Sequence, residues 1–150
     1  MLNTKRFSWL LVMVWMVVIF SFSAQPANQS RELSKGVTAV VMQWAEQLFP
    51  DAKIDVANVH RNMRKKAHVF VYFVLGVLVL RALYQSGVRG GKAFTVALGI
   101  CILYAILDET HQYFVPGRGA QLSDVGLDAL GSFMGAGVYR WWRILRKKTI

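Results

Sequence analysis

The chain has 150 residues, which leaves room for one domain. Hydrophobic residues make up 55% of the chain and its mean hydropathy is +0.36, both high for a soluble domain of this size. The net charge is +10, but the basic residues flank apolar blocks, a distribution that favours a membrane protein and argues against nucleic-acid binding. The single cysteine, Cys101, excludes an intramolecular disulfide and is interpreted as a packing residue.

The first apolar block covers residues 7–24 and contains no charged residue. A helix of this length nearly spans the hydrocarbon core of a bilayer, which is roughly 30 Å thick. The alternative is a secretory signal peptide, with Lys5 and Arg6 before the apolar run and Ala24 at a cleavage site. The bulky Phe22 fits such a cleavage site poorly, so we favour a retained first membrane span.

Residues 25–66 form the one long polar stretch. Within it, apolar residues recur at helical spacing between residues 37 and 48, and Pro50 ends the pattern. This pattern predicts an amphipathic helix in the first outer loop. The helix is expected either to pack against the spans or to lie in the membrane interface.

Three further apolar segments predict spans over residues 67–83, 93–109 and 124–142. The sequence therefore predicts an all-α integral membrane bundle of four transmembrane helices, forming a single domain over residues 1–150. The last span contains four glycines that would allow neighbouring helices to approach closely: Gly126, Gly131, Gly135 and Gly137.

Basic residues are distributed unevenly beside the predicted spans. One side of the membrane would collect ten of them: Lys5, Arg6, Arg81, Arg89, Lys92, Arg140, Arg143, Arg146, Lys147 and Lys148. The short connection on the other side, between the third and fourth spans, has only Arg118. Because positive residues favour the cytoplasmic side, we expect both termini to be cytoplasmic. This rule does not explain Arg64, Lys65 and Lys66, which would face outward.

Most polar residues of unusual position fall at the outward-facing ends of the second, third and fourth spans. Several are spaced three or four apart and so share a helix face. We predict that they form one ligand-binding site: His68, Tyr72, Asp108, Glu109, His111, Gln112, Arg118, Asp124 and Asp128.

Asp128 is the most informative of these residues because it lies about one turn inside an apolar segment. A carboxylate there must face the bundle and have a partner, for which Arg118, Lys65, Lys66 and His68 are the candidates. A structural ion-pair network that holds the spans together is the alternative to a functional site. The acids and histidines could in principle bind a metal, but Arg118 would repel a cation, so we expect neither a metal nor a cofactor.

Three stretches of the chain closely resemble the motifs of the VanZ-like family, and together they cover nearly all of it. The longest runs from Leu103 to Arg118 and includes Asp-Glu-Thr-His-Gln and Pro-Gly-Arg; Asp124-Val125 and Asp128-Ala-Leu-Gly131 follow it. The others are residues 22–30 after the first span and residues 64–76, with His68 and Tyr72. The family often has an acidic residue just before the tyrosine, whereas this chain has Val71.

The resemblance implies a multi-pass protein of the bacterial inner (plasma) membrane, in a family whose namesake is associated with teicoplanin resistance. We expect its partners to be membrane lipid and an anionic or amphiphilic compound of the cell envelope, bound at the outward-facing site. One alternative is a membrane enzyme acting on a lipid-linked envelope intermediate, with an Asp–His pair as acid and base. Another is a structural accessory subunit, since a fold does not determine a function.

Overall fold

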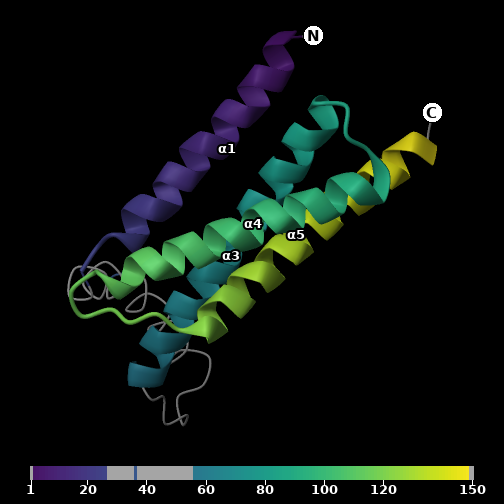
Figure 1. Cartoon of the computed structure of the whole chain (residues 1–150). Helices are drawn as coiled ribbons and strands as arrows, with labels where there is room; N and C mark the ends of the chain where they lie inside the picture. Colours follow the sequence, from purple (N-terminus) through teal and green to yellow (C-terminus); the bar gives the residue numbers. More distant parts are fainter. Residues whose placement is uncertain (1, 27–35, 37–55, 149–150) are drawn as a thin grey trace, which may run out of the picture.

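The computed structural model describes residues 2–26, 36 and 56–148, and these form four long α-helices without a strand. The helices are α1 (Leu2–Ser23), α3 (Val56–Gln85), α4 (Gly90–Tyr113) and α5 (Leu122–Lys148). They lie side by side as an elongated bundle (Figure 1). The all-α prediction is confirmed for the described part of the chain.

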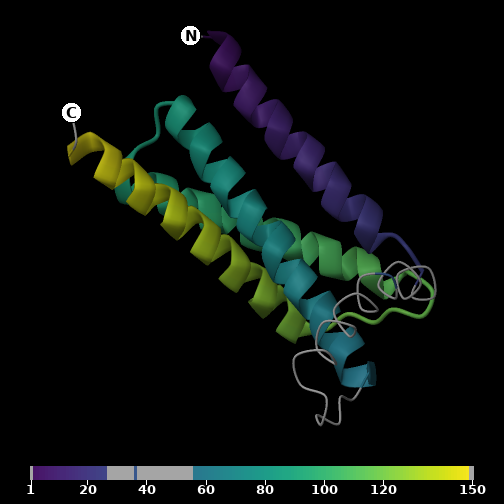
Figure 2. The same cartoon turned by 180° about the vertical axis from the view of Figure 1, so that it is seen from behind.

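The helices alternate in direction so that the bundle has two distinct ends. Both chain termini and the α3–α4 turn lie at one end, which we call the basic end (Figures 1 and 2). The ends of α1 and α4 and the start of α5 lie at the opposite end, which we call the site end. Helices α3 and α5 therefore run parallel to each other, away from the site end.

Three of the helices are long and apolar enough to cross a membrane, over Thr4–Ser23, Lys65–Gln85 and Gly90–Tyr113. Helix α5 does not meet the same hydropathy requirement. Helix α3 begins at Val56, well before the apolar segment expected from residue 67, because a helix can continue into water beyond the stretch that a bilayer covers. The amphipathic helix predicted over residues 37–48 lies outside the described residues.

Helices α3 and α5 share the largest interface, and glycines bring their backbones into contact. At three glycines an added Cβ atom would collide with the partner helix backbone: Gly76 at Ser132, Gly131 at Val69 and Gly135 at Phe73. Close approach of this kind stabilises helix pairs in a bilayer, where apolar side chains gain little by leaving lipid. Two of the four glycines predicted for this role in the last span, Gly131 and Gly135, therefore have it.

The prediction was wrong for the other two glycines of α5. A Cβ atom added to Gly126 or Gly137 would meet no atom of the described residues within 4 Å. These residues lie at other angular positions on the helix, so they do not face α3. Glycine content alone did not identify the contact face, whereas the four-residue spacing of Gly131 and Gly135 does.

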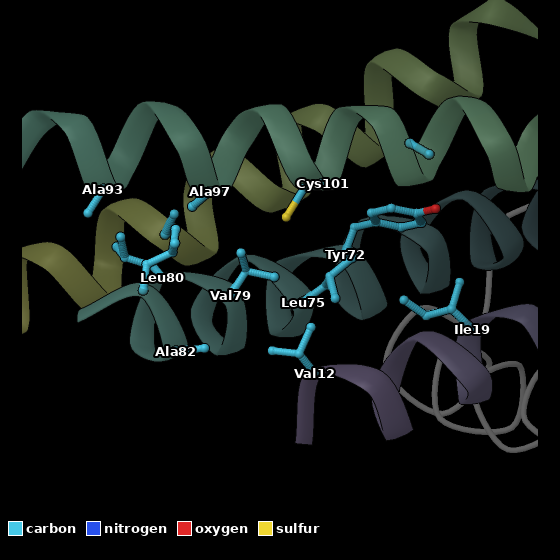
Figure 3. Close-up of a cluster of buried hydrophobic side chains, with 13 residues drawn as sticks. Val12, Ile19, Tyr72, Leu75, Val79, Leu80, Ala82, Ala93, Ala97 and Cys101 are labelled. Atoms are coloured by element: carbon cyan, nitrogen blue, oxygen red, sulfur yellow. The ribbon is translucent and has the colours of Figure 1, made fainter. Parts of the chain in front are cut away.

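Helix α4 packs through a stripe of small residues at four-residue spacing, Ala93, Ala97, Cys101 and Ala105, all fully buried. Figure 3 shows the first three pointing from α4 toward the apolar side chains of α3. Small side chains let the helix axes approach closely and leave room for the larger residues of α3. Cys101 is thus a packing residue, as the sequence suggested.

Helix α1 is attached to the bundle by apolar contacts and by hydrogen bonds, three of which lie before its last turn. The bonds run from Trp9 Nε1 to Ser86 Oγ (3.0 Å), from Trp15 Nε1 to the Val71 carbonyl (2.9 Å) and from Tyr104 Oη to the Met16 carbonyl (2.6 Å). They are spread along the helix, so α1 is held at several levels. Its remaining surface exposes large apolar residues, as expected of a lipid-facing helix.

Substitution of Gly135 by Ala tests the α3–α5 crossing. The new methyl group would overlap the Phe73 carbonyl, so the helices must separate, and we expect the free energy of unfolding to fall by about 1–3 kcal/mol. Gly137→Ala is the matched control on the same helix, because its methyl group would meet no atom within 4 Å in the part of the chain that the structure describes. Thermal unfolding in detergent measures both. Equal melting temperatures for the two variants would contradict the close crossing.

Candidate functional site

The buried face of α4 changes from apolar to polar where the helix reaches the site end. After the small-residue stripe, the same face carries Asp108, Glu109 and Gln112, and Asp128 approaches from α5. All four side chains are at most 4% exposed. Burying three carboxyl groups is unfavourable unless neighbouring groups compensate for the lost hydration, so the partners of each one determine what the site can do.

His68 of α3 is the partner of Asp128. Its Nδ1 atom lies 3.5 Å from Asp128 Oδ1, and Asp128 is 1% exposed. The pair is formed because Gly131, one turn beyond Asp128, lies against the backbone of Val69, the residue after His68. Of the four candidate partners named from the sequence, the structure selects His68; Lys65 and Lys66 are exposed at the start of the membrane-spanning part of α3.

Tyr72 lies one turn beyond His68 on the same face of α3 and is fully buried. It interacts electrostatically with both Asp108 and Asp128, and its ring lies 6.3 Å from that of Tyr104. The hydroxyl group has no hydrogen-bond partner among the described residues. The same holds for Glu109 Oε2, so the cluster contains buried polar atoms that a bound molecule could satisfy.

A tight turn after α4 brings Arg118 back to the cluster. The Arg118 amide donates a hydrogen bond to the Val115 carbonyl at 3.1 Å, with Pro116 and Gly117 between them. Gly117 has φ +74°, and a proline followed by a glycine of positive φ is typical of a type II turn. The Pro-Gly-Arg sequence therefore has a geometric role, since it reverses the chain and points the guanidinium group at the bundle.

Arg118 links the loop to two helices. Its Nη1 donates to Gln112 Oε1 and its Nη2 to the Phe22 carbonyl at the end of α1, each at 3.2 Å. Gln112 in turn donates from Nε2 to Asp108 Oδ2, also at 3.2 Å. The chain of contacts from Arg118 through Gln112 to Asp108 extends from the surface of the site end to its buried carboxyl groups.

Glu109 organises the start of α5. Its Oε1 accepts a hydrogen bond of 2.6 Å from the backbone amide of Gln121, the residue before the first turn of that helix. The first amides of a helix have no hydrogen-bond partner within it, and a carboxylate can accept a bond from one of them. Its negative charge also interacts favourably with the helix dipole. Asp124, half-buried in that first turn, lies near enough to interact electrostatically with Glu109 and Asp128.

His111 and Ser23 lie where α1 meets α4. The His111 ring packs against Phe20 of α1, with the ring centroids 4.5 Å apart, so it is placed at the edge of the cluster. The buried Ser23 hydroxyl faces Asp108. Ser23 was not among the residues predicted for the site, although a polar residue at the end of an apolar span is a signal that could have identified it.

The nine predicted residues therefore gather at the site end. Three of them carry the buried carboxyl groups, five lie around these groups, and His111 lies at the edge. Asp108 interacts electrostatically with His68 of α3 as well as with Asp128 of α5. Among the described residues, no group of three or more His, Cys, Asp or Glu side chains has the arrangement of a metal site.

The profile of one protein family matches residues 7–143, which is nearly the whole chain, under the description VanZ/LLP1. The chain belongs to the VanZ/LLP1 family. This confirms the resemblance seen in the sequence motifs. No curated protein and no solved structure matches the chain in the same comparisons. With three helices able to cross a membrane, the protein is a VanZ-family membrane protein.

The motifs of the VanZ-like sequence thus have structural correlates at the site end. Its second-span motif supplies His68 and Tyr72, and its longest motif supplies the polar end of α4 and the turn to Arg118. Val71, where the family often has an acidic residue, is partly buried against the core, and its carbonyl accepts the Trp15 hydrogen bond. In this chain that position contributes to the attachment of α1.

Substitution of Gly117 by Ala tests the turn that positions Arg118. A non-glycine residue at φ +74° is strained by about 1–2 kcal/mol, so we expect a lower melting temperature and weaker attachment of the loop to α1. Gly119→Ala is the control, because that residue has no positive φ and its added Cβ meets no atom within 4 Å among the described residues. Thermal unfolding and proteolysis between residues 113 and 122 measure the effect. Unchanged stability and protection in Gly117→Ala would contradict the role of the turn.

Proposed function

We propose that this VanZ-family protein crosses the bacterial plasma membrane four times and binds a cell-envelope or glycopeptide-type compound at its site end, which faces outward. The observation that carries the proposal is the buried cluster of Asp108, Glu109 and Asp128 in an otherwise apolar bundle. Ionisable residues within membrane segments are costly and are usually retained for function. Binding such a compound would connect the protein with resistance to glycopeptide antibiotics.

The surface of α5 supports a fourth membrane span. Its outward face is apolar at helical spacing and consists of Leu130, Phe133, Met134, Val138, Trp141 and Leu145, each about half-exposed. In water such a stripe would be unfavourable, whereas lipid would cover it. The helix falls short in hydropathy because its other face carries the glycines and Asp128 that contact α3. The rise from Asp124 to Arg143 is about 28 Å, close to the hydrocarbon thickness of roughly 30 Å.

The separation of charges supports the outward orientation of the site end. The described acidic residues, Asp108, Glu109, Asp124 and Asp128, all lie at that end. The basic end carries Lys and Arg in the α3–α4 turn and at both termini, as cytoplasmic segments usually do. Lys65 and Lys66 are exposed at the site end, against this rule, and a role in attracting a negatively charged ligand would explain their position.

The chemistry of the cluster suggests a ligand with both donor and acceptor groups. Its buried carboxyl groups can accept hydrogen bonds from amide, hydroxyl or amine groups. Arg118, Lys65 and Lys66 at the rim can bind phosphate or carboxylate groups. An amphiphile could present such a head group while its apolar part remains in the bilayer. This combination fits an envelope compound better than a purely apolar lipid.

One observation favours an enzyme as the second candidate function. The His68–Asp128 contact places an imidazole beside a buried carboxyl group, an arrangement that can orient the ring for proton transfer. Arg118 could then bind the phosphate of a lipid-linked envelope intermediate. In this case the ligand of the site would be a substrate, and His68 would accept a proton from it or from water.

The proposed topology is tested with reporter fusions. Fusions after Lys92 and at the C-terminus are expected to report a cytoplasmic position, and a fusion at Gly119 an external one, because the basic end should remain inside. Paired alkaline phosphatase and fluorescent protein reporters measure both outcomes. An external C-terminus would refute the outward-facing site, even if all four spans were present.

A second test separates binding from scaffolding at the His68–Asp128 pair. Removing one partner of a buried pair costs about 3–5 kcal/mol, whereas replacing both with apolar residues can be neutral. Asp128→Leu alone should therefore reduce the amount of folded protein, and Asp128→Leu with His68→Leu should restore it. If the pair serves a site, the folded double variant should still fail to complement a deletion strain.

The readouts are thermal stability in detergent and the antibiotic-susceptibility and lipid profiles of the complemented strain. Thr110→Val is the control, since its hydroxyl group is exposed and donates to the Ile106 carbonyl within α4. Full complementation by the folded double variant would show that the pair is structural and would defeat the proposed function.

A further inference from the structure

Three arginines of α5 at the basic end are each stacked over an aromatic ring. The Cζ atoms lie 5.7 Å from the Phe94 ring centroid for Arg140, 4.6 Å from Tyr84 for Arg143 and 4.1 Å from Trp142 for Arg146. Residues three apart are neighbours on a helix surface, so the guanidinium groups form a continuous strip. The rings come from α3, α4 and α5, so the strip covers the junction of three helices.

Each of these rings is itself packed against another ring, Phe94 against Phe133 and the other two against Tyr139. Tyr139 of α5 lies between the rings of Tyr84 and Trp142, with centroid distances of 6.2 Å and 5.8 Å. A guanidinium group stacked on a fixed ring loses much of its freedom before any ligand arrives, while the N–H groups at its edge stay available. Such a group is already arranged to donate two parallel hydrogen bonds to a phosphate.

The positive charge of the strip is not balanced locally by the described acidic residues. Asp124 and Asp128, the acidic residues of α5, lie at the site end, as do Asp108 and Glu109 of α4. From Asp128 to Arg143 the helix rises about 22 Å. The basic end adds further exposed charge through Lys5, Arg6, Arg89 and Lys92. The strip therefore combines preoriented donors with an uncompensated positive field.

The neighbouring surface shows where the strip lies relative to a bilayer. Trp141 and Leu145 of α5 are about half-exposed or more, at the same level as the arginines but on the outward face. Tryptophan in this position is typical of the membrane interface, the depth of the lipid phosphates. Arginine side chains at this depth can extend their charged ends to the same level.

We propose that Arg140, Arg143 and Arg146 form a binding site for the phosphodiester head group of an anionic phospholipid. The stacked guanidinium groups donate to the phosphate oxygens, and the acyl chains extend into the surrounding leaflet. The site is independent of the polar cluster at the site end. Its ligand is a lipid of the surrounding leaflet, whereas the proposed envelope compound binds about one membrane thickness away.

The experiment measures lipid retained by the purified full chain in a neutral detergent. Dioleoyl-phosphatidylglycerol is titrated against dioleoyl-phosphatidylcholine, and native mass spectrometry counts the bound lipid. We expect a clear preference for phosphatidylglycerol, and a loss of apparent affinity of about tenfold or more in Arg140→Gln/Arg143→Gln. The matched control is Lys5→Gln/Lys92→Gln, which removes the same charge from exposed residues at the same end and should change affinity little.

Each other outcome would overturn the proposal. Equal losses in the two double variants would mean diffuse attraction by surface charge, and equal retention of phosphatidylcholine would mean no recognition of the head group. Displacement of the lipid by inorganic phosphate at equal concentration would assign the strip to a soluble anion. If the arginine double variant does not fold, Arg143→Lys decides, since it keeps the charge and removes the planar donor; unchanged affinity would then refute the site.

Discussion

The contact between the backbones of α3 and α5 determines the geometry of the rest of the molecule. Gly131 and Gly135 are one turn apart on α5, and they face Val69 and Phe73, which are also one turn apart on α3. Two such contacts fix both the distance and the register of two parallel helices. That register places Asp128, which lies one turn before Gly131 on α5, opposite His68, the residue before Val69 on α3. If either helix were shifted by a single residue, the side chain of Asp128 or His68 on that helix would point about 100° away from its partner.

Two opposing effects determine the stability of a helix bundle in a membrane: close packing of small residues and the burial of carboxyl groups. Apolar side chains gain little by leaving lipid for a helix interface, so small residues and close packing must hold the helices together. The alanines and Cys101 of α4 meet this requirement along most of its length. Buried carboxyl groups, in contrast, lower the stability of the bundle at the site end. Hydrogen bonds from Gln112 to Asp108 and from Gln121 to Glu109 offset part of that cost.

The sequence predicted the helical class and the membership of the polar cluster because both depend on local pattern. Apolar length predicted four spans, and three of the helices are long and apolar enough to cross a membrane. Three- or four-residue spacing placed polar residues on shared faces. It could not choose among four partners for Asp128, since that choice depends on the register between α3 and α5. Glycine content likewise misassigned Gly126 and Gly137, because only the relative rotation of the helices decides which glycines face a neighbour.

The same reasoning explains how the chain can lack the acidic residue that the family often has before the tyrosine. Adjacent residues of a helix point about 100° apart, so Val71 and Tyr72 cannot serve the same surface. Tyr72 points into the cluster, whereas the Val71 carbonyl receives Trp15 of α1. The carboxyl groups of Asp108, Glu109 and Asp128, which come from α4 and α5, therefore provide the acidic character of the cluster without a contribution from that position.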